Sequence, residues 1–157
     1  MKEGEFIPLD IELLDQNSNL TTIGKYLGKY MVLYFYPKDY TPGCTLEACS
    51  FRDNNEDIEL LGAKVVGISA DSVDRHKGFK EKFNLNFELL SDIEHKFSEA
   101  MGVWQEKKMF GKIGFGIKRS TFVVGPNGKI LKIWPEVNVN GHTEEVLDYL
   151  KTLHKDR

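Results

Sequence analysis

The sequence predicts an α/β fold in which a central mixed β-sheet is flanked by helices. Short apolar runs alternate along the chain with longer stretches whose apolar residues recur at helical spacing. Residues 31–36 (Met-Val-Leu-Tyr-Phe-Tyr) are apolar throughout, as expected for a central strand that is covered on both faces. Residues 126–129 (Pro-Asn-Gly-Lys) are a hairpin-turn signal between two further apolar runs, so an antiparallel strand pair is expected to join the sheet.

The N-terminal part of the chain is expected to form a β-hairpin extension of this sheet. A short strand is predicted after Pro8 within residues 6–14, and residues 15–19 have the composition of a turn. Residues 20–23 would return as a second short strand. Residues 24–29 would then form a loop or a single helical turn before the central strand.

Helices and strands alternate through the middle of the chain. Gly62 is a plausible end of the first helix, and Phe79 and Phe83, four residues apart, give the second helix an inner face. The predicted helices span residues 45–61, from the cap residues 71–74 to about 83, and 93–101, and the predicted strands span 64–69 and 87–90.

The C-terminal third begins with an irregular stretch, residues 103–118, which we expect to be a surface loop. Its aromatic segment 110–115 is expected to pack within the loop, and a peroxide-access or partner surface is the alternative. Strands are predicted at 119–124 and 129–134, and a last helix at 143–154. The resulting order, β-α-β-α followed by β-β-α, is that of the thioredoxin-like fold. Residues 1–157 are therefore predicted to form a single thioredoxin-like domain.

Composition excludes several classes of protein. A chain of 157 residues with 41% apolar content is long enough to bury one full core. The net charge of −3 gives no electrostatic footprint for nucleic acid. No apolar run approaches the ~20 residues needed to cross a bilayer, and the N-terminus lacks the apolar centre of a signal peptide. The expected location is the cytoplasm, with no membrane partner.

The most informative stretch is residues 37–49, which follows the central strand and leads into the first long helix. Pro42 and Gly43 stand where a loop must end before a helix begins, so Cys44 is expected at the helix N-terminus. Unpaired backbone N–H groups and the helix dipole favour negative charge there. A thiol at such a position is converted more readily to the thiolate, which is the reactive form. We therefore expect Cys44 to be a nucleophile.

The cysteine and histidine pattern argues against a structural role for the thiols. In a reducing compartment, Cys44 and Cys49 are not expected to form a permanent disulfide. There is no second cysteine pair, and none of the four histidines is near them in sequence, which disfavours zinc. The expected role of His142 is capping or packing, whereas three other histidines are expected to be solvated, namely His76, His95 and His154.

Residues 34–49 (YFYPKDYTPGCTLEAC) resemble the active-site signature of the peroxiredoxins, and within them the Prx Q subgroup, also called bacterioferritin comigratory protein. The resemblance covers nearly the whole chain. Further matching stretches are residues 51–53, 67–69, 103–107, 119–122 and 141–142. The segment 6–11 departs from the usual pattern of the subgroup, which leaves the docking of the first strand open.

The resemblance implies a thioredoxin-dependent peroxidase that reduces hydrogen peroxide and organic hydroperoxides, acts as a monomer, and requires no metal or organic cofactor. Thioredoxin would be the reductant, with glutaredoxin as the alternative. The matching positions imply a peroxidatic Cys44, a resolving Cys49, polar partners Thr41 and Arg119, loop prolines Pro37 and Pro42, and an acid, Glu47, that orients the arginine.

This chemistry requires a thiolate that attacks one peroxide oxygen while charge develops on the departing oxygen. Arg119 and the backbone N–H groups of Gly43 and Cys44 are expected to stabilise that charge, as preorganised donors do in oxyanion sites. The Thr41 hydroxyl both donates and accepts, so it would bridge the thiolate and the peroxide. Pro42 would screen the sulfur from water.

The implied disulfide conflicts with an intact helix. Residues five apart on an α-helix rise ~7.5 Å and point ~140° apart, which separates their Cα atoms by ~8.6 Å. A disulfide tolerates a Cα separation of only up to ~7 Å. If Cys44 and Cys49 are both helical, the first turn must therefore unwind before they can join.

The residues alone leave two other functions open. One is a thiol–disulfide oxidoreductase, although those enzymes usually carry Cys-x-x-Cys and here four residues separate the cysteines. The other is a redox sensor on the same fold. Cys49 read by itself is equally a small apolar side chain, and Arg119 a surface residue at the start of a strand.

Overall fold

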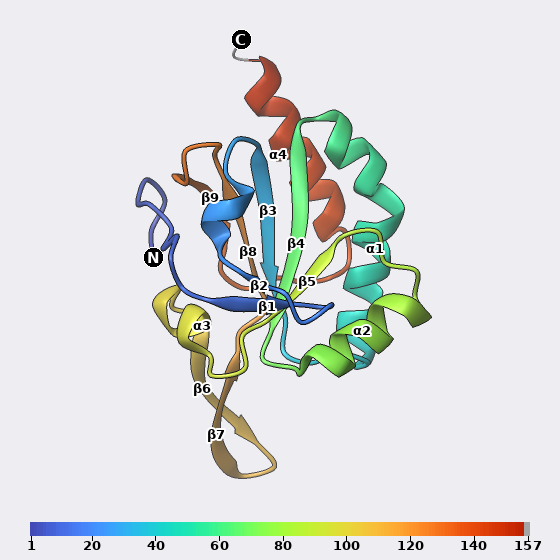
Figure 1. Cartoon of the computed structure of the whole chain (residues 1–157), viewed down its shortest axis with the longest axis vertical. Coiled ribbons are helices and arrows are strands. Elements are labelled where there is room, and N and C mark those ends of the chain that lie inside the picture. Colours follow the sequence, from blue (N-terminus) through green and yellow to red (C-terminus); the bar gives the residue numbers. More distant parts are fainter. Residues whose placement is uncertain (156–157) are drawn as a thin grey trace.

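The structure is a computed structural model that describes residues 1–155 and is built around a seven-stranded mixed sheet with the strand order β2-β1-β5-β4-β3-β8-β9 (Figure 1). The strands of this sheet are β1 Leu13–Asp15, β2 Leu20–Thr21, β3 Tyr30–Phe35, β4 Ala63–Ser69, β5 Glu88–Ser91, β8 Ser120–Val124 and β9 Ile130–Trp134. The helices are α1 Pro42–Leu60, α2 Val73–Lys82, α3 Lys96–Ala100 and α4 His142–Lys155.

The centre of the sheet is β3, which pairs in parallel with β4 and antiparallel with β8. Five of its six residues are buried, as its uninterrupted apolar sequence predicts for a strand covered on both faces. Helices α1 and α2 connect the parallel strands β3, β4 and β5, because parallel neighbours need a crossover connection. This arrangement confirms the predicted mixed sheet with flanking helices.

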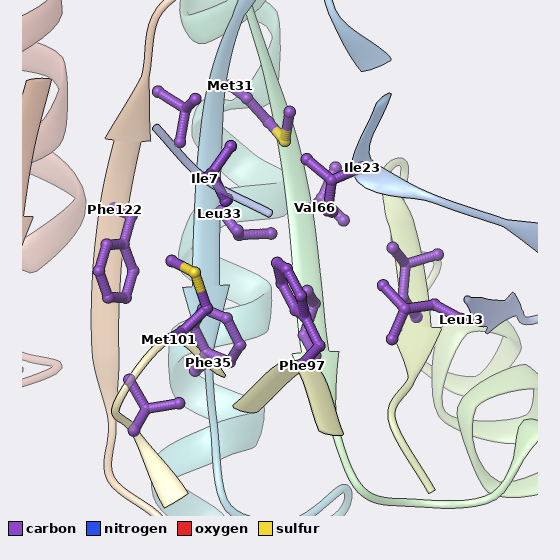
Figure 2. Packing of buried hydrophobic residues seen from close by; sticks show 14 of the residues in the cluster. Ile7, Leu13, Ile23, Met31, Leu33, Phe35, Val66, Phe97, Met101 and Phe122 are labelled. Carbon is purple, nitrogen blue, oxygen red and sulfur yellow. The ribbon is translucent and has the colours of Figure 1, made fainter. Parts of the chain in front are cut away.

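Each face of the sheet has its own core. On one face, α1, α2 and α4 cover a cluster that includes Tyr34, Phe51 and Phe79. On the other face, α3 and the N-terminal segment cover a second cluster, shown in Figure 2. In that cluster the ring of Phe35 lies 5.8 Å from the ring of Phe97 and 5.6 Å from that of Phe122. The alternating side chains of β3 therefore anchor both layers.

The predicted N-terminal hairpin is present, since β1 pairs antiparallel with β2. The strand is shorter than predicted, beginning at Leu13, and β1 also pairs with β5 at the edge of the main sheet. Before it, Phe6 makes only an isolated bridge to Lys129. The segment predicted as a loop or one helical turn contains a 3₁₀ helix, Ile23–Tyr26.

Two helix boundaries differ from the prediction. Helix α1 begins at Pro42, three residues earlier than predicted, because a proline is well suited to the first helical position, where its missing N–H costs nothing. Helix α3 has only five residues and begins after His95, whose φ of 49° is left-handed. Among residues 1–155, no helix combines the length and apolar character needed to cross a membrane.

The prediction that residues 103–118 form a surface loop is wrong. These residues form a two-stranded hairpin, β6 Trp104–Met109 and β7 Lys112–Ile117, which projects from one end of the molecule (Figure 1). Its turn is made by Phe110 and Gly111, both with positive φ. Phe110 is 99% exposed, so the packing expected for the aromatic segment is also wrong. Lysines and glycines between the apolar residues hide the strand pattern.

Candidate active site

Cys44 is the third residue of α1 and is 1% exposed. Thr41 is the N-cap residue, and the first backbone bond of the helix runs from the N–H of Thr45 to the carbonyl of Thr41 at 2.9 Å. The N–H groups of Gly43 and Cys44 precede that bond and have no acceptor within the helix. The predicted position of Cys44 at a helix N-terminus is confirmed.

Arg119 lies 75 residues after Cys44 in the sequence but beside it in the fold. It directly precedes β8, and the antiparallel pairing of β8 with β3, which sets Ser120 opposite Phe35, brings it beside the loop that leaves β3. Its Nη2 donates to the Cys44 Sγ at 3.2 Å. Gly43 makes room for the guanidinium, since a Cβ there would lie 3.2 Å from Nη2.

Glu47 lies one turn after Cys44 on α1 and holds the other side of the same guanidinium. Its Oε1 accepts from Arg119 Nη1 at 2.7 Å, while its buried Oε2 has no partner among the residues described. Burial raises the pKa of Glu47 to about 7, although the charge and hydrogen bond of Arg119 oppose the rise. Burial lowers the pKa of Arg119, but Glu47 and Cys44 more than offset this and raise it overall. Arg119 therefore remains a cation beside the sulfur.

The remaining predicted residues surround this group without touching the sulfur. The Thr41 hydroxyl donates to the carbonyl of Lys38 at 2.8 Å and does not cap the helix. Pro37 is half-buried and is the second residue after β3. Cys49 is a half-buried free thiol on α1, five residues beyond Cys44. Helix geometry turns it ~140° away from Cys44. The structure thus brings together Cys44, Glu47 and Arg119, but not Cys49.

Lys107 is a neighbour of the site that the sequence analysis missed. Its Nζ donates to the carbonyl of Ile117 at 2.5 Å, and its side chain lies across Gly116 at the base of the β6–β7 hairpin. Burial and then the charge of Arg119 lower the pKa of Lys107, whereas Cys44 opposes the shift. A strand predicted at residues 104–109 would have placed every second side chain on one face of the strand, and Lys107 would then have been a candidate neighbour of the site.

The prediction that His76 is solvated is wrong, because its side chain is fully buried. Its Nδ1 lies 2.5 Å from Asp39 Oδ2, and its Nε2 lies 3.0 Å from the carbonyl of Leu90. The polar composition of α2 hides this burial. The signal that would have found it is spacing, since His76, Phe79 and Phe83 recur at i, i+3 and i+7 on one helical face.

Within residues 1–155, one group of side chains has the composition of a metal site, namely Asp39, Asp71 and His76. Their donor atoms are already engaged with one another and with protein neighbours. The oxygens of Asp39 face Tyr36 and His76, and those of Asp71 face Ser69, Arg75 and the backbone of Asp39. The donor set therefore fits a hydrogen-bonded network.

The site combines two elements that thiol chemistry uses. A helix N-terminus and an adjacent guanidinium both favour the thiolate over the thiol. The same guanidinium, at hydrogen-bond distance from Sγ, is positioned to stabilise charge on an oxygen that approaches the sulfur. The arrangement can therefore support attack by sulfur on an electrophile whose leaving group is anionic.

Comparisons with known proteins agree with this chemistry. A model of the AhpC/TSA family matches residues 4–133. The peroxiredoxin Bcp of Bacillus subtilis is 50% identical over 144 residues, which are 92% of this chain and 92% of that protein. The peroxiredoxin Bcp of Escherichia coli is 39% identical over 151 residues, which are 96% of each.

Solved structures show the same fold. A mutant of the PrxQ of Xylella fastidiosa matches with a TM-score of 0.93 and 38% identity, covering 98% of each chain. The bacterioferritin comigratory protein of Xanthomonas campestris, studied for its alkyl peroxide reduction activity, matches with a TM-score of 0.87 and 38% identity. That match covers 93% of this chain and 96% of the other, and the thioredoxin-like fold expected from the order of elements is confirmed.

Proposed function

Because the chain belongs to the AhpC/TSA family and is a peroxiredoxin of the Bcp/Prx Q group, and hence a thiol peroxidase, we propose that Cys44 is the residue whose sulfur attacks the peroxide. The observation that carries this assignment is the 3.2 Å contact between Arg119 Nη2 and Cys44 Sγ at the first turn of α1. A guanidinium beside a sulfur at a helix N-terminus is the electropositive setting in which reactive cysteines occur.

In the proposed first step, the Cys44 thiolate attacks one oxygen of the hydroperoxide. The S–O bond forms as the O–O bond breaks, and the other oxygen leaves as hydroxide or alkoxide and takes up a proton. The sulfur is oxidised to a sulfenic acid while the peroxide is reduced. Arg119 and the N–H groups of Gly43 and Cys44 are the donors that stabilise the developing charge.

Glu47 and the loop residues hold this geometry. Glu47 fixes the guanidinium through its 2.7 Å contact with Arg119 Nη1. The Thr41 hydroxyl has its own proton engaged by Lys38, so it presents lone pairs that accept from the hydroperoxide O–H. Pro37 and Pro42 bound the loop, and Pro42 contributes no N–H that would compete for the substrate.

We propose that Cys49 then condenses with the sulfenic acid, releasing water and forming an intramolecular disulfide. Both cysteines are free and lie within α1, where ideal geometry separates the Cα atoms of such a pair by ~8.6 Å, beyond the reach of a disulfide. The first turn of α1 must therefore unwind during each cycle. The reduced helix and the oxidised, locally unwound segment are the two states of the enzyme.

The experiment that tests the assignment is rapid mixing of the reduced protein with hydrogen peroxide. We expect Cys44→Ser to abolish fast oxidation, and Cys49→Ala to leave it fast while sulfenic acid accumulates. Oxidation of the unaltered protein at the rate of free cysteine would instead favour the oxidoreductase or sensor function. An intact α1 through both cysteines in the disulfide form, seen by amide hydrogen exchange, would contradict the unwinding.

A thioredoxin-type reductant regenerates a peroxiredoxin of this kind, and we propose thioredoxin itself rather than glutaredoxin. Steady-state peroxide consumption with each reductant system distinguishes them. We also propose that residues 1–157 act as a single-domain monomer in the cytoplasm, where a transient disulfide is readily reduced. Light scattering coupled to size exclusion, on both the reduced and the oxidised protein, tests the oligomeric state.

A further inference from the structure

Asp39 is a buried carboxylate in an otherwise exposed loop. It lies in the segment that joins β3 to α1, three residues before Pro42, the first residue of the catalytic helix. Lys38 and Tyr40 on either side are exposed, whereas Asp39 is only 1% exposed. A buried carboxylate is tolerated only when its oxygens are paired or hydrogen-bonded, so its partners define what the loop is attached to.

Every polar atom of Asp39 has such a partner. Tyr36 donates its hydroxyl to Oδ1 at 2.6 Å, and His76 Nδ1 faces Oδ2 at 2.5 Å. The backbone N–H donates to Asp71 Oδ2 at 2.8 Å, and the carbonyl accepts from Arg75 Nη2 at 3.1 Å. Three of these four partners belong to α2 or to the segment before it. The polar contacts of Asp39 therefore attach the loop to α2.

His76 is itself held at both ring nitrogens. Its Nε2 lies 3.0 Å from the carbonyl of Leu90 on β5, which can only accept a hydrogen bond, so Nε2 carries a proton. A proton must also lie between Nδ1 and the Asp39 carboxylate at 2.5 Å. The ring therefore links β5 to the loop through two directed contacts and has little freedom to rotate.

Tyr40 shows how closely the loop is fitted to α2. Its φ of 67° is left-handed, a conformation that a bulky residue keeps only when its surroundings impose it. Its ring lies 5.3 Å from the guanidinium carbon of Arg75 and 5.2 Å from the ring of Phe79. A Cβ on Gly78 would lie 2.6 Å from the Tyr40 hydroxyl. The chain thus enters α1 in one defined direction.

We propose that Asp39 and His76 are positioning residues of the peroxidase reaction. Their buried pair fixes the loop on α2 and so sets where the backbone enters the first turn of α1, which carries Cys44. The same pair marks the N-terminal limit of the segment that unwinds, so that the turn refolds in register after the disulfide is reduced. The inference rests on the proposed role of Cys44 as the peroxidatic residue.

The test uses variants of His76, which lies on α2 and makes no hydrogen bond to the sulfur. Its shortest contact is the one to Asp39, and longer ones reach Tyr36 and Ser69. His76→Leu removes both ring nitrogens. His76→Asn returns an amide N–H near the position of Nδ1 and serves as the conservative rescue. Asp92→Asn is the control for general destabilisation, because Asp92 is a buried carboxylate that accepts from the backbone of Phe97 and Ser98 at the start of α3.

The measurement is the second-order rate constant for oxidation of the reduced protein by hydrogen peroxide, followed by tryptophan fluorescence across a pH series, with folding checked by circular dichroism. We expect His76→Leu to react roughly tenfold to a hundredfold more slowly while folded, since small misplacements of reacting groups have effects of that size. His76→Asn should recover most of the rate, and Asp92→Asn should react like the unaltered protein.

A His76→Leu protein that reacts at the rate of the unaltered protein overturns the inference. The inference is also overturned if Asp92→Asn slows the reaction as much as His76→Leu does. If His76→Leu does not fold because it leaves the Asp39 charge unpaired, the double variant Asp39→Asn/His76→Leu removes that charge and is judged by the same rate. Cys44→Ser separates the two proposals. If Cys44→Ser is still oxidised rapidly, the assignment of Cys44 is refuted. If Cys44→Ser loses rapid oxidation but His76→Leu reacts at the unaltered rate, only the positioning role is refuted.

Discussion

Arg119 contacts two acidic partners at once, the Cys44 sulfur at 3.2 Å and the Glu47 carboxylate at 2.7 Å. The carboxylate fixes the direction of the guanidinium, but its charge also competes with the thiolate for the same cation. Burial raises the pKa of Glu47 to about 7, which means that this competing charge is partly neutralised near neutrality. Glu47 therefore orients the guanidinium without placing a full second negative charge beside the sulfur.

The titration of Glu47 predicts a pH dependence of stability. The folded protein keeps the proton up to about pH 7, whereas the unfolded chain releases it near the ordinary value of 4.5. Ionisation of Glu47 therefore destabilises the fold progressively between these two values, and the loss is complete above the higher one. Glu47→Gln, which cannot ionise, should gain stability relative to the unaltered protein by about 2–3 kcal/mol between pH 5 and pH 8.

Urea unfolding of both reduced proteins at the two pH values measures this difference, because the other titrating groups are common to both and cancel. A difference in unfolding free energy that stays constant with pH would show that Glu47 is already ionised in the fold across this range.

The sequence predicts the residues around the Cys44 sulfur better than the more distant residues that hold the loop before it. Cys44, Glu47 and Arg119 were predicted from the motif around Cys44 and its family resemblance, and the structure brings them together. His76 and Lys107 were missed because their roles depend on contacts with residues distant in sequence. Asp39 is 37 residues from His76, and no periodic pattern within either segment reports that pairing.

Helix α2 meets the catalytic loop at Gly78, and this contact predicts an unusual substitution effect. Alanine is normally about 1 kcal/mol better than glycine inside a helix. Here a Cβ at residue 78 would lie 2.6 Å from the Tyr40 hydroxyl, so the ring must move. We expect Gly78→Ala to lower the free energy of unfolding by about 1 kcal/mol, as overpacked sites do.

The matched variant is Gly78→Ala combined with Tyr40→Phe. Removing the hydroxyl leaves the next nearest atom of that ring 4.0 Å from the new Cβ, an ordinary contact distance. Relative to Tyr40→Phe alone, the added alanine should then stabilise the protein, as measured by urea unfolding. Stabilisation by Gly78→Ala in the presence of Tyr40 would refute the proposed contact.

Elements whose side chains are buried were predicted well, and the exposed element was not. Strand β3 lies close to its predicted bounds because its sequence is apolar throughout, and helix α4 because acidic residues mark its first turn. The β6–β7 hairpin was predicted as a loop because most of its distal residues face solvent, where burial imposes no alternation on the sequence. The early start of α1 at Pro42 follows from backbone geometry rather than from apolar spacing.

Across the molecule, stability is concentrated in the two cores on either side of the sheet. The base of the projecting hairpin joins one core through Ile117 and Trp104, whereas its exposed tip contributes little. Phe110 at its tip is 99% exposed. We expect Phe110→Ser to change the free energy of unfolding by less than about 0.5 kcal/mol, as is usual for exposed sites. The buried Phe97, fully enclosed in the core shown in Figure 2, provides the contrast, and Phe97→Ala should cost about 3–5 kcal/mol.

Urea unfolding of both variants under reducing conditions makes this comparison. A loss above 1 kcal/mol for Phe110→Ser would mean that the hairpin tip packs against the body of the protein in solution.

The guanidinium of Arg119 and the sulfur it contacts are 75 positions apart along the chain. During synthesis, the ribosome releases Cys44 long before it has made Arg119, and β8 must then pair with β3 for the two to meet. If Arg119 activates Cys44 as proposed, the nascent polypeptide carries a thiol of ordinary reactivity until that moment. Fast consumption of oxidant would then report that β8 has docked against β3.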